Sequence, residues 1–156
     1  MITSSDKPTE VLFYHLENAP LERVLPSLIE KTLARGWRAV VQAGSNERLD
    51  ALDALLWTYK DDSFLPHATA KDGDPAVQPV FLTTEAENPN DAAVRFLVDG
   101  ADSADIASYQ RIVYMFDGQD AQALAQARQQ WTAAKAAHCT VTYWQQAAGG
   151  RWEKKG

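Results

Sequence analysis

"VLFYHL", Val11–Leu16, is the stretch that decides the fold of this 156-residue chain. Its apolar side chains stand at consecutive positions instead of alternating with polar ones. Consecutive apolar residues are typical of a strand that is covered on both faces, as in a parallel sheet. We therefore expect residues 11–16 to form a buried strand.

Further stretches along the chain share this apolar composition. They are "RAVVQA" (residues 38–43), "PVFLTT" (79–84), "VRFLVD" (94–99), "RIVYMF" (111–116) and "CTVTYW" (139–144). Helical patterns lie between several of them, and the order strand, helix, strand is the signature of right-handed βαβ units. The sequence predicts an α/β sandwich with a mostly parallel central sheet and helices on both faces.

This single domain is expected to span residues 10–148. Residues 1–9 are expected to form a flexible N-terminal segment. For residues 149–156, "GGRWEKKG", two interpretations stay open: a frayed tail, or the return arm of a hairpin that turns at Gly149 and Gly150.

Three stretches carry helical patterns. The first covers residues 20–36, with Gly36 as its C-terminal stop, and Pro26 is expected to break or kink it. The second begins at Ser45 or Asn46 as the N-cap. The third is the alanine-rich stretch 118–138. The apolar residues expected to face the core are Leu21, Val24, Leu25, Leu28, Ile29 and Leu33 in the first helix and Leu49, Leu52, Leu55 and Leu56 in the second.

Composition excludes several classes of protein. Hydrophobic residues make up 46% of the chain, but no apolar run is long enough to cross a bilayer. The net charge is −6, whereas a domain that binds duplex DNA usually needs a basic face. One cysteine, Cys139, excludes an intramolecular disulfide and a cysteine-based zinc site. The polar N-terminus is not a signal peptide, so we expect a cytoplasmic protein without direct DNA binding.

Sequence motifs for catalysis are missing. There is no phosphate-binding loop, no H-E-x-x-H and no G-x-S-x-G. Asp99 and Asp117 each follow an apolar run and precede glycine, so they either hold Mg²⁺ at strand ends or form ordinary turns, and the turn is favoured. The histidines His15, His67 and His138 lack ligand spacing. We expect no catalytic residue, cofactor or metal; the alternative is a metal-dependent α/β enzyme that uses Asp99 and Asp117.

A stretch without regular periodicity, residues 55–78, carries Trp57, Phe64 and Pro66. Long irregular connections are usually functional or disordered, and disorder disfavours aromatic residues. The loop either folds onto its own core or forms a protein–protein site, in which aromatic side chains dominate the binding energy. Self-association through Trp57 and Phe64 is a further alternative.

Leu124, Arg128, Trp131 and Lys135 share one face of the alanine-rich helix. We interpret this face as distinct from the core face. Two cations beside an aromatic ring suit an acidic peptide that ends in an apolar residue and a free carboxylate. The alternative is an ordinary solvated face on which Trp131 leans against its neighbours.

The chain resembles the chi subunit family of the bacterial DNA polymerase III holoenzyme. The resemblance is carried by "LLWTYKDDSFLPH" (residues 55–67), "RIVYMFDG" (111–118) and "ARQQWTAAKAAHCTVTYW" (127–144). It implies a Rossmann-like, non-catalytic accessory subunit of the clamp loader. Such a subunit pairs with the psi subunit and binds the acidic C-terminal tail of single-stranded-DNA-binding protein (SSB), which ends in Phe with a free carboxylate.

Each candidate residue receives a role from this resemblance. Trp57, Phe64 and Pro66 are expected to contact psi. Arg128, Trp131, Lys135 and Leu124 are expected to bind the SSB tail. Asp117 stands where the resemblance leads us to expect an apolar residue lining the tail pocket, so we expect it to alter the edge of that pocket.

Overall fold

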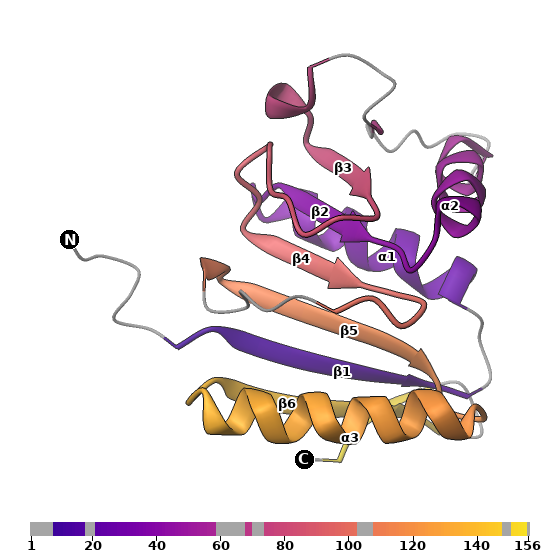
Figure 1. Cartoon of the computed structure of the whole chain (residues 1–156), viewed down its shortest axis with the longest axis vertical. Coiled ribbons are helices and arrows are strands. Elements are labelled where there is room, and N and C mark those ends of the chain that lie inside the picture. Colours follow the sequence, from indigo (N-terminus) through magenta and orange to yellow (C-terminus); the bar gives the residue numbers. More distant parts are fainter. Residues whose placement is uncertain are drawn as a thin grey trace.

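β1, Glu10–Leu16, lies inside the sheet between two parallel neighbours, β5 (Arg111–Asp117) and β6 (Thr140–Gln146). Val11 and Phe13 are completely buried, so the predicted buried strand is confirmed. Figure 1 shows the computed structural model in which β1 occupies this position. The structure describes residues 8–17, 21–58, 68–69, 74–102, 108–147 and 151–155.

The remaining strands extend the sheet on both sides of β1. They are β2 (Ala39–Gln42), β3 (Val80–Thr83), β4 (Val94–Leu97) and β7 (Trp152–Lys154). The spatial order is β3-β2-β4-β5-β1-β6-β7, and every pairing is parallel except that of β6 with β7. Each of the six predicted strand stretches overlaps one strand of this sheet.

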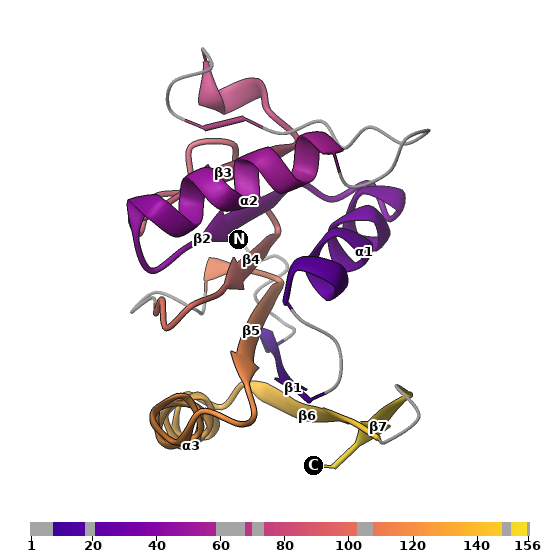
Figure 2. The ribbon, with the colours of Figure 1, turned by 90° about the vertical axis from the view of Figure 1, so that its right-hand side faces the viewer.

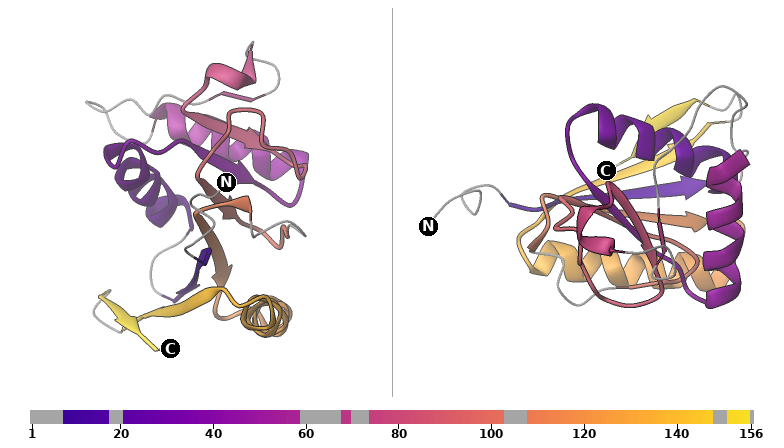
Figure 3. Two further views of the ribbon diagram at one scale, coloured as in Figure 1. Left: turned by 90° about the vertical axis from the view of Figure 1, so that its left-hand side faces the viewer. Right: turned by 90° about the horizontal axis from the view of Figure 1, so that it is seen from above.

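Helices cover both faces of the sheet, as predicted. α1 (Leu21–Ala34) and α2 (Asn46–Thr58) contribute buried leucines to one core cluster, which also contains Val41, Phe96 and Met115 of the sheet. α3 (Ala121–Ala136) places Ala127 and Ala134 in a second cluster. Figure 2 and the right-hand view of Figure 3 show the sheet between α1 and α3. The α/β sandwich with helices on both faces is therefore confirmed.

Local signals in the sequence account for the helix ends. Gly36 has φ +80°, which glycine adopts without strain, and its N–H donates to the Leu33 carbonyl over 2.9 Å after α1 has ended. Ser45 rather than Asn46 caps α2, since its hydroxyl accepts a hydrogen bond from the Arg48 N–H over 3.3 Å. Asp120 caps α3 in the same way through the N–H groups of residues 122 and 123.

Pro26 does not break α1, so the expectation of a break is wrong; a kink at Pro26 stays a prediction. The helix runs without interruption from Leu21 to Ala34, with Pro26 buried in its second turn. A proline this close to the helix start removes a single bond, the one that its N–H would donate to the Glu22 carbonyl. The Pro26 ring is buried, as are its helix neighbours Leu25 and Ile29, and burial of apolar surface is favourable.

The ends of the chain are described only in part. Thr9 is buried, and its hydroxyl donates to the Tyr109 carbonyl over 2.8 Å. At the other end β7 returns antiparallel to β6, so residues 152–154 form a hairpin arm. Residues 1–7 and the expected turn at Gly149 and Gly150 lie outside the described residues. Within the described part of the chain, none of the helices is both long and apolar enough to span a membrane.

Arg95 on β4 was not expected, because the stretch around it is otherwise apolar. Its side chain is completely buried, and its guanidinium donates to the side-chain oxygen of Gln42 and the hydroxyl of Tyr109. It also donates to the carbonyls of Glu85 and Glu87 over 2.7 and 2.8 Å. These bonds tie the connection between β3 and β4 to the middle of the sheet.

Replacing Arg95 tests this role. Arg95→Met keeps the apolar stem but leaves several buried acceptors unpaired, each of which costs about 1–3 kcal/mol. We expect a clear loss in the free energy of unfolding, measured by urea denaturation followed by circular dichroism. Arg23→Met on the exposed surface of α1 is the control and should change stability by no more than about 0.5 kcal/mol. Equal urea midpoints for the two variants would contradict the role given to Arg95.

Candidate peptide-binding site

A hollow of about 560 Å³ lies against α3, and we call it the α3 hollow. From α3 it is lined by Leu124, Ala127, Arg128, Trp131 and Thr132. Lys135 stands beside it, with its ammonium 5.3 Å from the centroid of the Trp131 ring. The structure therefore brings Leu124, Arg128 and Trp131 into one concave surface and places Lys135 next to Trp131 outside its lining.

The opposite wall of the α3 hollow comes from the sheet and the C-terminal arm. Its residues are His15, Tyr143, Gln145 and Lys155. In the parallel register of β1 and β6, Phe13 pairs with Tyr143 and His15 with Gln145, so alternate residues of both strands face α3. None of these residues was predicted from the sequence to belong to the site. The alternation of side chains along β1 and β6, combined with the strand register, would have identified them.

Trp131 is both a wall of the hollow and a part of the core. It is half-buried, and its ring centroid lies 5.6 Å from that of Phe13 and 5.8 Å from that of Tyr143. The interpretation of this helix face as distinct from the core face is therefore wrong for Trp131. The small side chains of Ala127 and Ala134 let α3 approach the sheet closely, which brings the neighbouring tryptophan into contact with β1 and β6.

Hydrogen bonds fix the positions of His15 and Tyr143 in the opposite wall of the hollow. His15 Nδ1 is 2.7 Å from the Tyr143 hydroxyl, and His15 Nε2 is 2.5 Å from Glu17 Oε1. Burial raises the pKa of the Tyr143 phenol, while the positive charge of Arg128 acts in the opposite direction. Since the ordinary value is already about 10, the phenol is neutral at physiological pH. Lys155 contributes a positive charge to this wall of the hollow.

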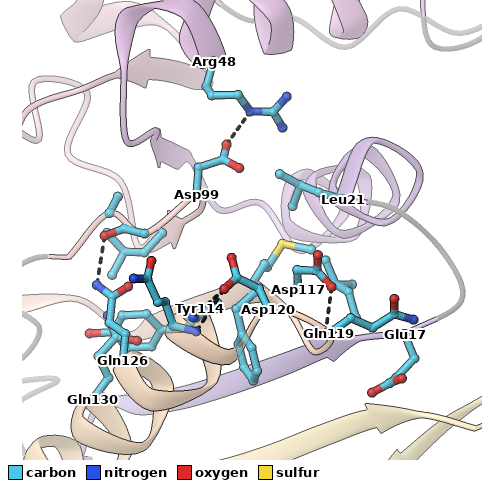
Figure 4. A pocket seen from close by; sticks show the side chains of 18 of the residues that line it. Glu17, Leu21, Arg48, Asp99, Tyr114, Asp117, Gln119, Asp120, Gln126 and Gln130 are labelled. Carbon is cyan, nitrogen blue, oxygen red and sulfur yellow. Dashed lines mark hydrogen bonds and ion pairs between the residues drawn. The ribbon is translucent and has the colours of Figure 1, made fainter.

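A second cavity, of about 770 Å³, lies at the carboxyl ends of β1, β4 and β5. Asp99 and Asp117 both line it (Figure 4). Asp99 is bound to Arg48 over 2.8 Å, and Asp117 accepts a hydrogen bond from the Gln119 N–H over 2.9 Å. Figure 4 shows the two carboxylates directed at these different partners.

These contacts favour turns over a metal site. Asp99 and Gly100 have φ of +54° and +82°, and Asp117 stabilises its own turn through Gln119. Among the described residues, no three His, Cys, Asp or Glu side chains are grouped so that they would hold a metal ion. Asp117 lines the second cavity and is not among the residues that line the α3 hollow, so its effect on the edge of a tail pocket stays a prediction. Asp117 is the last residue of β5.

The aromatic patch on the loop after α2 lies mostly outside the described residues. The backbone of Trp57 belongs to the last turn of α2, but its side chain is not described. Phe64, Pro66 and His67 lie outside the described part. Whether Trp57 and Phe64 lie together stays a prediction.

Comparison with known proteins agrees with the resemblance seen in the sequence. Residues 9–142 match the family described as DNA polymerase III chi subunit, HolC. A curated relative, the "Probable DNA polymerase III subunit chi" of Rickettsia prowazekii (strain Madrid E), is 31% identical over 103 residues. The aligned region covers 66% of this chain and 62% of the relative.

The family match extends from the residue before β1 into β6, so it includes α1, α2 and α3. It contains α3 with Leu124, Arg128, Trp131 and Lys135, and also the stretch of residues 55–67. On the extent of this match, the chain belongs to the family of DNA polymerase III chi subunits.

Proposed function

We propose that this chain is a non-catalytic accessory subunit of the replicative DNA polymerase, in the cytoplasm, that links the clamp loader to SSB. One side of this link is the psi subunit, and the other is the C-terminal tail of SSB. The observation that supports the proposal most directly is the α3 hollow, because Arg128 and Lys155 line it together with Trp131, and Lys135 lies over the Trp131 ring. The net charge of −6 agrees with a protein that reaches single-stranded DNA through a partner.

Each part of an acidic, Phe-ending tail has a counterpart in the hollow. The terminal phenyl ring packs on the apolar surface of Leu124 and Trp131. Aromatic side chains contribute strongly to binding at many interfaces. Arg128 is exposed at the rim and binds the terminal carboxylate through its two parallel N–H groups. Lys135, held over Trp131, attracts the aspartates that precede the phenylalanine.

The psi contact is assigned to the end of α2 and the loop that follows, with Trp57, Phe64 and Pro66. α2 packs into the core cluster on one face of the sheet, whereas α3 packs into the cluster on the other face. A partner bound at α2 and a partner bound at α3 would have the sheet between them, so one would not block the other. This arrangement suits a linking subunit.

Arg128→Ala tests the tail site. A charge-assisted hydrogen bond contributes about 1.5–3 kcal/mol, so we expect the affinity for a labelled tail peptide to fall about tenfold to more than a hundredfold. Fluorescence anisotropy with the intact protein measures this change. Arg23→Ala, which removes an exposed arginine from α1 on the other face, is the control and should bind like the wild type.

Amidating the terminal carboxylate of the peptide provides a second test of the same contact. We expect the amidated peptide to bind wild type weakly and to be insensitive to Arg128→Ala. If wild type and Arg128→Ala bind the free-carboxylate peptide with equal affinity, the tail does not bind in the α3 hollow.

Phe64→Ala tests the psi site. We expect weaker binding to purified psi in a titration, with little change in the free energy of unfolding, because a residue at an exposed partner site contributes little to the core. Val77→Ala, at a side chain that is 63% exposed, is the matched apolar control and should leave psi binding unchanged. A stability loss of about 3–5 kcal/mol for Phe64→Ala, as for a core phenylalanine, would show that Phe64 belongs to the core.

Self-association through Trp57 and Phe64 is tested separately, by sedimentation of the isolated protein at several concentrations. A monomer at all concentrations would contradict self-association.

A further inference from the structure

The C-terminal arm reaches a site that is otherwise built by α3 and the sheet. Lys155 lines the α3 hollow together with Arg128 and Trp131, although it follows β7 at the far end of the sheet order. Residues after 142 lie outside the family match, so Lys155 adds to this hollow a charge that the matched region does not contain.

Two contacts hold the arm where Lys155 can act. The Lys155 N–H donates to the Tyr143 carbonyl over 2.7 Å, which places the residue directly beside a wall of the hollow. On the other side of the arm, the ring of Trp152 packs edge-on against Tyr14, with centroids 5.1 Å apart, and joins the core cluster of α1 and α2. Successive residues of a strand point to opposite faces, so an arm anchored by Trp152 presents residues 153 and 155 to the α3 side.

The present partner of Lys155 is easily replaced. Its ammonium lies 3.2 Å from the Glu153 carboxylate, and both side chains are about half exposed, at 50% and 45%. An ion pair as exposed as this contributes at most about 1 kcal/mol, so an incoming carboxylate can compete with Glu153 for the lysine. No such competition is needed at Lys135, whose ammonium lies over the Trp131 ring.

We propose that the C-terminal arm forms the second wall of the peptide site, where Lys155 binds the acidic segment of the peptide from the side opposite Lys135. The apolar C-terminal residue lies against Leu124 and Trp131, and the carboxylates that precede it lie between Lys135 and Lys155. This inference rests on the proposed peptide-binding role of the α3 hollow and assigns a further residue that sets affinity for acidic sequences.

The experiment uses the full chain and a labelled peptide with consecutive aspartates and a C-terminal phenylalanine, followed by fluorescence anisotropy at low ionic strength. We expect Lys155→Ala to weaken binding about two- to fivefold, the range of an exposed charge pair. Lys154→Ala removes the same charge from the neighbouring residue of the arm, which does not line the hollow, and should bind within about twofold of wild type. Glu153→Gln frees Lys155 and should bind at least as tightly as wild type.

A second peptide, in which asparagines replace the aspartates, separates charge from shape. With this peptide Lys155→Ala and wild type should bind equally, while Arg128→Ala still weakens binding through the terminal carboxylate. Suppose that Arg128→Ala weakens binding of the acidic peptide but Lys155→Ala and Lys154→Ala bind it equally well. The proposed role of Lys155 is then wrong, while peptide binding in the α3 hollow is supported. If wild type does not bind the acidic peptide, or Arg128→Ala has no effect, the proposed site itself is wrong and the role of Lys155 is wrong with it.

Discussion

The aromatic contact between Phe13 and the side chains around it joins α3 to the sheet, and the candidate site depends on it. Phe13 is completely buried in β1; its ring stacks on Tyr114 with centroids 4.9 Å apart and contacts Trp131 and Tyr143. Aromatic pairs at such distances contribute beyond the area that they bury. Because Trp131 leans on this cluster, the helix cannot rotate without losing the contact, and Arg128 stays at the rim of the hollow.

The strands distribute residues between two chemically different regions. Side chains facing α3 build the hollow with its cations, whereas the carboxyl ends of β1, β4 and β5 border a cavity rich in carboxylates. Gly118 lies between these regions: a Cβ there would stand 1.9 Å from His15 Nε2, so the turn after β5 can pass the histidine only as glycine. His15 is hydrogen-bonded to Tyr143, so the turn at Gly118 helps to position a wall of the α3 hollow.

The local sequence was sufficient to predict most helices and strands and part of the candidate site. Consecutive apolar residues placed the strands, and Gly36, Ser45 and Asp120 account for the helix ends, because these signals act over a few residues. Spacing along a single helix also brought Arg128 and Trp131 to one surface. Pro26 shows the limit of local rules, since α1 continues through this residue and its ring is buried.

The chain by itself determined the parallel α/β architecture and the chemistry carried by α3, since both follow from periodicities that are visible within short windows. Only the tertiary structure decided that Trp131 shares in the core, that Arg95 is buried against Gln42 and Tyr109, and that Lys155 stands in the α3 hollow. These facts depend on strand order and register, which bring together residues far apart in the sequence. No local pattern contains that information, because pairing partners are selected by the packing of the whole sheet.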